Sequence, residues 1–206
     1  YIRFNKNFYK AKEDSEYKML CALQYHYFEK YFSKTDKIVE FGCGTGHNLL
    51  RAREINKTAD LYGCDWALSS QKILKTLNDK NILKCVGKNF DFFTPDYDFK
   101  IENHGVYTVA ALEQIGVNFD NFLTYLITAK PKLCVHIEPL MELFDENNNI
   151  DAFCKNYCKK RNYLHGFATK LKELESKNIV EIIELKRNYI GSMFLEGYSV
   201  IAWRVL

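Results

Sequence analysis

The sequence predicts an α/β domain in which seven strands form a mostly parallel sheet with helices on both faces. The apolar run 38–39 leads into the glycine-rich stretch 40–46 and then into a helical pattern, which is a strand-turn-helix signature. Strand-like and helical segments then alternate, and this alternation implies parallel pairing with right-handed crossovers. Two β-rich runs near the end have no helix between them, so they should pair as an antiparallel hairpin at the sheet edge.

The individual elements follow from hydrophobic periodicity and from turn signals. Apolar residues at three- and four-residue steps predict a first helix at 16–32. Strands of the alternating part are predicted at 37–41, 60–64, 83–86, 106–111 and 133–137, and helices between them at 47–55, 69–77 and 120–129. Helical sequence follows at 151–177, and the hairpin pairs 179–185 with 199–205.

The chain length of 206 residues fits one domain, 1–206. Within this domain we expect an N-terminal helical cap at 1–35 and a helical insertion after the fifth strand at 140–177. The aromatic residues Phe4, Phe8 and Tyr9 are either a lid over a ligand or a strap packed on the core.

Composition narrows the class of protein. A net charge of +3 is mild, whereas a nucleic-acid-binding domain usually has a denser basic surface. The seven cysteines are odd in number and mostly lie in apolar runs, which favours reduced core thiols and a cytoplasmic location. We find no apolar run long enough to span a membrane and no signal-peptide pattern.

The glycine-rich stretch predicts a site for an adenosine-containing ligand. The dinucleotide fingerprint needs its third glycine at the position of His47, so a pyrophosphate is not favoured. Glu40 precedes the glycines, and Asp65 ends the next strand, where a carboxylate can accept both hydroxyls of a ribose.

At these positions the sequence resembles the class I S-adenosylmethionine (SAM)-dependent methyltransferases. The resemblance covers 38–206: Glu-Phe-Gly-Cys-Gly-Thr-Gly at 40–46, Asp65, Asn-Phe-Asp-Phe at 89–92 and Ala-Leu-Glu-Gln-Ile at 111–115. It implies a Rossmann-like fold, an enzyme, and SAM as the cofactor with S-adenosylhomocysteine as its product.

The resemblance also implies a set of cofactor contacts. The backbone of 42–46 would line the methionine portion with Glu40 near its amino group, and Asp65 would hold the ribose. Trp66 would flank the adenine, whose edge Asp91 and the Phe92 amide would read. The complete predicted cofactor set is Glu40, Gly42, Cys43, Gly44, Gly46, Asp65, Trp66, Asp91, Phe92 and Ala110.

His136 and Glu138 are the predicted catalytic residues. Their spacing puts both side chains on the same face of a strand, at the carboxyl end where an acceptor should lie. They would orient or deprotonate an acceptor hydroxyl, a step needed only if the acceptor carries a proton. The alternative is a hydrogen-bonded core histidine next to a solvent-facing carboxylate.

Further residues are predicted to bind the acceptor. Glu113 and Gln114 follow the fourth strand, and Gln114 stands where many relatives carry histidine. Arg161, Tyr163 and His165 lie in the insertion, where Arg161 suits a phosphate or carboxylate; a solvated helix face is the alternative. No metal site is predicted, because Cys154 and Cys158 lack a second ligand pair.

A narrower resemblance concerns the acceptor. The segments 136–140, 161–167, 191–192 and 197–199 are similar to small bacterial methyltransferases of surface-polysaccharide (capsule) biosynthesis. This implies O-methylation of a small polar acceptor such as a sugar, a sugar nucleotide or a phosphorylated capsule precursor. The alternatives are an N-methyltransferase of a small metabolite and a non-catalytic SAM-binding partner subunit. A nucleic-acid methyltransferase is disfavoured, because no Asn-Pro-Pro-Tyr type motif follows the fourth strand.

Overall fold

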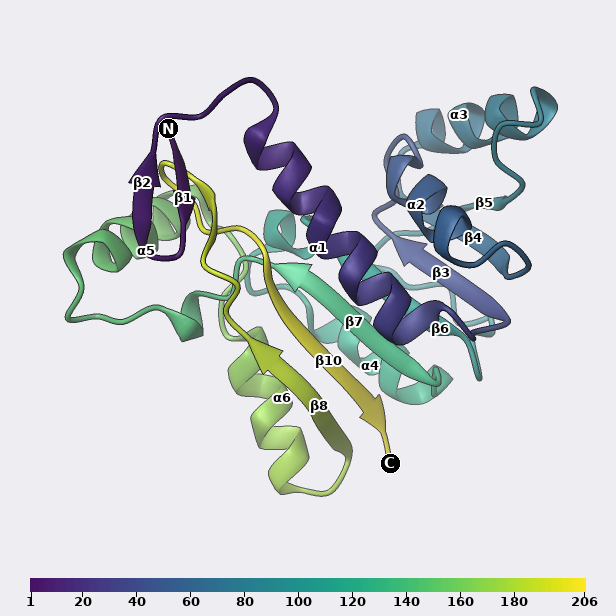
Figure 1. Cartoon of the computed structure of the whole chain (residues 1–206). Coiled ribbons are helices and arrows are strands. Elements are labelled where there is room, and N and C mark those ends of the chain that lie inside the picture. The colour runs from purple at the N-terminus through teal and green to yellow at the C-terminus, as the bar shows by residue number, and fades with distance from the viewer.

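Seven strands pair into one sheet at the centre of the molecule (Figure 1). The computed structural model describes residues 1–206. In chain order these strands are β3 (Lys37–Phe41), β4 (Asp60–Asp65), β5 (Val86–Asn89), β6 (Gly105–Val109), β7 (Leu133–Glu138), β8 (Val180–Lys186) and β10 (Ser199–Val205). Their spatial order is β5-β4-β3-β6-β7-β10-β8. Strands β5 to β7 are parallel and β10 runs antiparallel to both β7 and β8, which confirms the predicted sheet and its closing hairpin.

Helices cover both faces of this sheet, as the sequence predicts. On one face lie α1 (Ser15–Phe32), α2 (His47–Ile55) and α3 (Leu68–Asp79), and on the other α4 (Asp120–Ala129) and α6 (Phe167–Ser176). Helix α1 crosses the face nearest the viewer in Figure 1, with α4 behind the sheet. The central strand β6 is buried along its whole length, as expected for a parallel strand covered on both sides.

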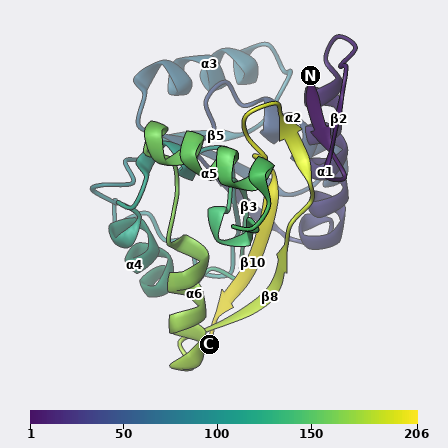
Figure 2. The same ribbon diagram turned by 90° about the vertical axis from the view of Figure 1, so that its left-hand side faces the viewer.

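The connections after β6 and β7 contain three further helical segments. They are η1 (Leu112–Ile115), η2 (Met141–Leu143) and α5 (Asn149–Arg161), the first two being 3-10 helices. The predicted helical region 151–177 is therefore two helices, α5 and α6, which Figure 2 shows as separate bodies. Asn162 and Gly166 have left-handed φ angles of 52° and 85°. These angles end one helix and begin the next.

The third predicted strand, 83–86, is displaced in the structure, because β5 begins only at Val86. Leu83 and Cys85 are buried, but they lie in the loop after α3. The side chain of Asn78 accepts the Cys85 N–H at 2.9 Å and donates to the Cys85 carbonyl at 2.7 Å. Since these backbone groups are already bonded, Cys85 does not enter the ladder.

A second, three-stranded sheet joins the start of the chain to a segment near its end. Strand β1 (Ile2–Phe4) pairs antiparallel with β2 (Asn7–Tyr9) and with β9 (Ile190–Ser192). The expected helical cap 1–35 therefore begins with a hairpin, and only its later part is helix. Phe4, Phe8 and Tyr9 are about half exposed and belong to none of the hydrophobic cores, so the aromatic strap packed on the core is not formed.

No helix in the structure combines the length and the apolar character needed to cross a bilayer. All seven cysteine thiols are free and six of them are buried. Cys154 and Cys158 pack in a small core with Met141 and Phe144, as expected of reduced core thiols.

Candidate active site

The turn between β3 and α2 contains three glycines with positive φ angles, Gly42, Gly44 and Gly46. The N–H groups of Gly42 and Cys43 both donate to the carbonyl of Cys64, at 2.8 and 3.0 Å, so the turn is bound to the end of β4. A side chain at Gly42 would overlap the Cβ atom of Ala111, whereas a Cβ at Gly44 would meet no atom within 4 Å. The turn is therefore packed on one side and open on the other.

Asp65, the last residue of β4, lies directly beside this turn. One of its carboxylate oxygens accepts the Gly44 N–H at 2.8 Å and the other accepts the Ala67 N–H at 2.9 Å. Each oxygen keeps a lone pair for a further donor. The neighbouring side chain of Trp66 is 75% exposed, so its ring face is accessible to a ligand.

A cavity of about 540 Å³ opens between the turn and the carboxyl ends of the neighbouring strands. Its lining residues are Gly42, Gly44, Asp65, Trp66, Asp91, Phe92, Phe93, Ala110, Ala111, Gln114 and Ile115. Sequence reasoning missed only Phe93, Ala111 and Ile115, which lie in the same short segments as predicted residues. Three residues of the predicted cofactor set do not line the cavity: Glu40, Cys43 and Gly46.

Ala110 forms part of the cavity wall in a strained backbone conformation. Its φ angle is 48°, a region that residues with a side chain rarely adopt. The Ala110 N–H donates to the Ile137 carbonyl at 3.0 Å, and the chain then leaves the sheet and enters η1. The predicted strand 106–111 therefore ends at Val109. Such strain persists where the surrounding structure fixes it, and it gathers at functional sites.

Glu40 lies beneath the glycine turn and does not line the cavity. It is fully buried, and its carboxylate accepts Asn48 Nδ2 at 2.7 Å and the Tyr107 hydroxyl at 3.1 Å. Burial raises the pKa of Glu40 to about 8, against the lowering effect of these hydrogen bonds. Asn48 also accepts from Gln24 of α1 at 2.8 Å. The predicted contact of Glu40 with a ligand amino group is thereby corrected: Glu40 fixes the first turn of α2.

His136 is also fully buried, and Thr108 binds its ring. The Thr108 hydroxyl donates to Glu138 Oε1 at 2.7 Å, so its oxygen is left to accept the His136 Nδ1–H at 2.9 Å. We assign this tautomer from the network. Burial lowers the pKa of His136 to about 3, which keeps the imidazole neutral. The ring packs against Phe167 and Trp203, with centroids 5.1 and 6.2 Å away.

Glu138 binds the backbone of the turn that follows β6. Its Oε1 accepts the N–H groups of Ala111 and Leu112 at 3.0 and 3.2 Å, and its Oε2 accepts that of Glu113 at 3.2 Å. Burial raises the pKa of Glu138 to about 7, and these hydrogen bonds limit the rise. Neither His136 nor Glu138 lines the cavity, and both are fully buried. The prediction that they act directly on an acceptor is therefore corrected: Glu138 instead holds the backbone of 111–113 in place.

Glu113 has a half-buried side chain that makes no hydrogen bond or ion pair. Its backbone is held on both sides, because its N–H donates to Glu138 and its carbonyl accepts the Leu164 N–H at 3.1 Å. Burial raises the pKa of Glu113 to about 8, the charge of Glu138 adds to the rise, and Arg161 opposes it. The next residue, Gln114, lines the cavity. The Glu113 carboxyl is therefore a proton-binding group without a fixed partner, in a segment that lines the cavity.

Arg161, Tyr163 and His165 lie at the end of α5 and in the segment after it, outside the cavity lining. The Arg161 guanidinium is 5.9 Å from the ring centroid of Tyr157 and 5.8 Å from that of Tyr163. His165 Nδ1 lies 2.9 Å from the Tyr163 carbonyl oxygen. The structure thus gathers these residues near Glu113 but does not bring them to the cavity wall.

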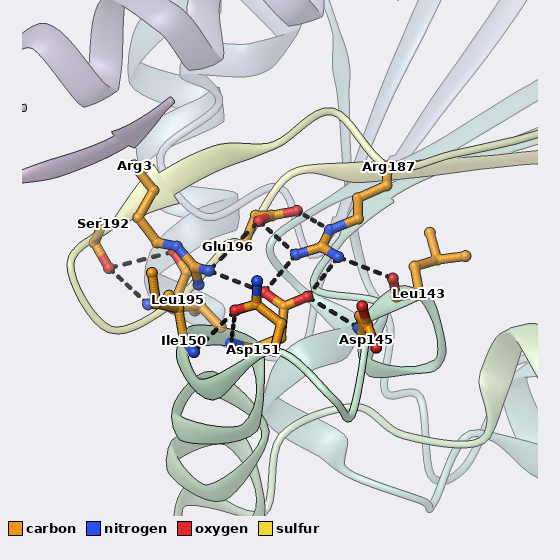
Figure 3. Close-up of polar contacts among 10 residues, drawn as sticks. Arg3, Leu143, Asp145, Ile150, Asp151, Arg187, Ser192, Leu195 and Glu196 are labelled. Carbon is orange, nitrogen blue, oxygen red and sulfur yellow. Dashed lines mark hydrogen bonds and ion pairs between the residues drawn. The ribbon is translucent and has the colours of Figure 1, made fainter. Parts of the chain in front are cut away.

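Four charged side chains, three of them buried, connect the N-terminal hairpin to the rest of this region (Figure 3). This charged cluster consists of Arg3, Asp151, Arg187 and Glu196. Arg187 binds Asp151 at 2.7 Å and Glu196 at 2.6 Å, and Arg3 binds Asp151 at 3.1 Å. The cluster joins β1, α5 and both sides of β9. Its charges balance, so we regard it as a structural support beside a small cavity of about 240 Å³.

Comparison with known proteins identifies the fold. No protein-family model matches the sequence, and no curated protein matches it. Solved structures do match. Magnesium protoporphyrin IX methyltransferase from Synechocystis superposes with a TM-score of 0.67 at 8% identity, over 97% of this chain and 90% of that one. The N-methyltransferase NodS from Bradyrhizobium japonicum gives 0.66 at 11% identity, over 94% and 89%.

Larger enzymes match over part of their length. An amino-demethyl-riboflavin dimethyltransferase from Streptomyces davawensis gives a TM-score of 0.59 at 13% identity, over 88% of this chain. The chain spans about half of that enzyme, 54% of its length. At such identities the likeness concerns the fold: the chain has the Rossmann-like fold of the class I SAM-dependent methyltransferases.

Proposed function

We propose that this protein is a SAM-dependent methyltransferase that acts on a small-molecule acceptor. One observation carries the proposal: Asp65 accepts the Gly44 N–H at the edge of a cavity lined by four strand ends. In an open α/β sheet the ligand binds at the carboxyl ends of the strands. A glycine turn joined to a carboxylate at this place suits a nucleoside that carries an amino acid.

The residues around the cavity fit this cofactor. The open side of the turn at Gly44 permits close approach to the backbone, so 42–46 would hold the methionine portion. The free lone pairs of Asp65 would accept the ribose hydroxyls, and the exposed ring of Trp66 would cover the adenine. Asp91 and Phe92 line the same cavity and would read the adenine edge. When bound, the sulfonium cofactor supplies a methyl group that is already activated.

The protein would then mainly position the acceptor, exclude water and remove a proton. Glu113 is our candidate for the proton acceptor, because its raised pKa of about 8 lies near neutral pH and its carboxylate has no fixed partner. Gln114 would bind the acceptor from the cavity wall. His136 and Glu138 would act through the backbone that carries these two residues.

Oxygen and nitrogen are both candidate acceptor atoms. One similar structure is an O-methyltransferase from neocarzinostatin biosynthesis and another is the N-methyltransferase NodS. A finer hypothesis rests on the sequence resemblance. It is O-methylation of a sugar, sugar nucleotide or phosphorylated capsule precursor, with Arg161, Tyr163 and His165 as contacts. Sugar nucleotides therefore belong in the assay panel.

Calorimetry with SAM and with NAD tests the cofactor. We expect SAM to bind and NAD not to bind. Asp65→Ala should weaken SAM binding by at least about tenfold, because the ribose loses two charge-assisted hydrogen bonds. Asp60→Ala is the matched control, since Asp60 lies exposed at the other end of the same strand. Equal SAM affinity in both variants would contradict the assignment.

An assay for S-adenosylhomocysteine release tests the reaction. The panel should contain hydroxyl acceptors, amines and sugar nucleotides. Release with at least one acceptor is expected, and Glu113→Gln should lower turnover without changing SAM affinity. SAM binding with no release for any acceptor would instead favour a non-catalytic SAM-binding subunit.

A further inference from the structure

Four aromatic side chains, two exposed and two partly buried, form a continuous stripe along α5. We call this stripe, made of Phe153, Tyr157, Tyr163 and Phe194, the aromatic track. Ring centroids of Phe153 and Phe194 are 5.9 Å apart, those of Phe194 and Tyr157 are 5.8 Å apart, and those of Tyr157 and Tyr163 are 6.1 Å apart. Each ring therefore contacts the next.

Only the Tyr163 end of the track packs against a hydrophobic core. Helix α5 turns Asp151, Cys154 and Cys158 inward, and these residues are buried. Phe153 remains 55% exposed and Phe194 43% exposed, although burying a phenylalanine side chain stabilises a folded protein. Apolar side chains that gather on a surface mark a binding site more often than single exposed ones do.

Arg161 supplies a cation at one end of the track. Its guanidinium lies near the rings of Tyr157 and Tyr163, and it makes no salt bridge, unlike Arg3 and Arg187. The Arg161 side chain is exposed. A guanidinium held over aromatic rings keeps N–H donors free for a planar carboxylate.

This end of the track is joined to the candidate active site. The Leu164 N–H, next to Tyr163, donates to the Glu113 carbonyl at 3.1 Å. Asn162 packs so closely on Gly116 that an added Cβ there would lie 2.9 Å from it. Between these contacts lie Gln114 and Ile115, which line the cavity. The Tyr163 end of the track is therefore held against the segment that carries Glu113 and the cavity residue Gln114.

We propose that the aromatic track binds the acceptor, and that the acceptor is a planar aromatic compound with a carboxylate. This proposal rests on the proposed methyltransferase function. The flat apolar rings would stack on the acceptor ring, and Arg161 would bind its carboxylate. Phe153 and Phe194 offer no hydrogen bond, whereas a sugar needs several polar partners. A protein partner is disfavoured because a stable interface uses roughly 20–30 residues on each side, whereas the track has four.

Calorimetry with three hydroxy-aromatic acids tests the proposal: salicylate, 4-hydroxycinnamate and 3-hydroxy-2-naphthoate. Each is titrated with and without S-adenosylhomocysteine. At least one should bind, and the saturated ring analogue of that acid should bind about tenfold more weakly because it cannot stack. A sugar nucleotide should not compete. If no acid binds, or if the saturated analogue binds equally well, the proposal is wrong.

Point variants locate the binding. Phe194→Ala and Arg161→Gln should each weaken the acid by about tenfold. Phe8→Ala is the matched control, because Phe8 is also 43% exposed but lies on β2, and it should change affinity by less than about twofold. All three changes are at exposed side chains, and circular dichroism checks that folding is retained. Unchanged affinity in both track variants would overturn the proposal.

The two proposals fail in different ways. Absence of SAM binding to the wild-type protein would remove the methyltransferase function, whereas acid binding without cofactor would still be measured. SAM binding together with release from sugar nucleotides alone would remove the aromatic acceptor and leave the methyltransferase function intact. A dimer in analytical ultracentrifugation that Phe194→Ala dissociates would assign the track to an interface between two copies, against the proposal.

Discussion

Replacing Thr108 by valine should destabilise the protein, although the two side chains have nearly the same shape. The hydroxyl both donates to Glu138 and accepts from His136. In the variant Glu138 loses one charge-assisted hydrogen bond, and the Nδ1–H of His136 becomes a buried donor without an acceptor. Each loss costs about 1–3 kcal/mol, so we expect a total near 3 kcal/mol. In a chain of this size this corresponds to a melting temperature lower by roughly 6–12 °C.

Urea titration and differential scanning calorimetry measure this loss, and Thr108→Ser is the matched control. Serine keeps the hydroxyl and removes one methyl group, so it should lose only about 1 kcal/mol. Because Glu138 orders the 111–113 backbone, Thr108→Val should also lower methyl transfer more than it lowers SAM affinity. A valine variant as stable as wild type, or a serine variant that is equally destabilised, would refute the assigned hydrogen-bond network.

Three further changes test other parts of the structure. Burial raises the pKa of Glu40 from 4.5 to about 8, so the folded state binds this proton more tightly and its stabilising effect is lost as the pH rises from 4.5 to about 8. Glu40→Gln should flatten that decline in melting temperature; an unchanged pH profile would contradict the assignment. Arg187→Met should cost about 3–5 kcal/mol in urea titrations, because its two buried carboxylate partners lose a cation. Arg204→Met breaks an exposed pair and should cost less than about 1 kcal/mol, so equal losses would argue against the buried cluster. Gly44→Ala places a side chain at a positive φ in open space, so it should cost only about 1–2 kcal/mol of stability while weakening SAM binding; unchanged SAM affinity would exclude a close approach of the cofactor there.

Local signals in the sequence predicted most of the central sheet. The run from β3 through the glycine turn into α2 is contiguous, so its apolar pattern and its glycines act together. The third strand is predicted too early, because the apolar residues Leu83 and Cys85 are buried without belonging to a strand. They pack in a loop whose backbone is bound by Asn78. Hydrophobicity reports burial, and it does not report which backbone groups remain free to pair.

Pairing between distant short segments could not be predicted. Strands β1 and β9 have three residues each and lie at opposite ends of the chain. Neither segment is long enough to show a period, and only their tertiary pairing defines them as strands. The charged cluster has the same property, since its four members come from separate segments.

The cofactor side of the candidate site was easier to predict from the sequence than the surroundings of His136 and Glu138. Cofactor-side residues such as Asp65 follow strands directly, so chain order alone brings them to one edge of the sheet. For His136 and Glu138 the two-residue spacing gave a shared face, but it did not show that Thr108 lies opposite on the neighbouring strand. The only sign of that network in the sequence is the small polar residue Thr108 within the strand 106–109.

The position of β10 has a consequence for how the chain folds during synthesis. This strand lies between β7 and β8 in the sheet, yet it follows both of them in the chain. Strand β9, the partner of β1, also comes late in the chain, shortly before β10. The half of the sheet from β5 to β7 can therefore pair while the ribosome is still translating, whereas β8 and the N-terminal hairpin have no partner until β9 and β10 emerge. Until then β7 is an open sheet edge, and such edges recruit other chains. We expect nascent chains that stall before 199 to depend on chaperones, whereas chains that contain β10 close this edge themselves.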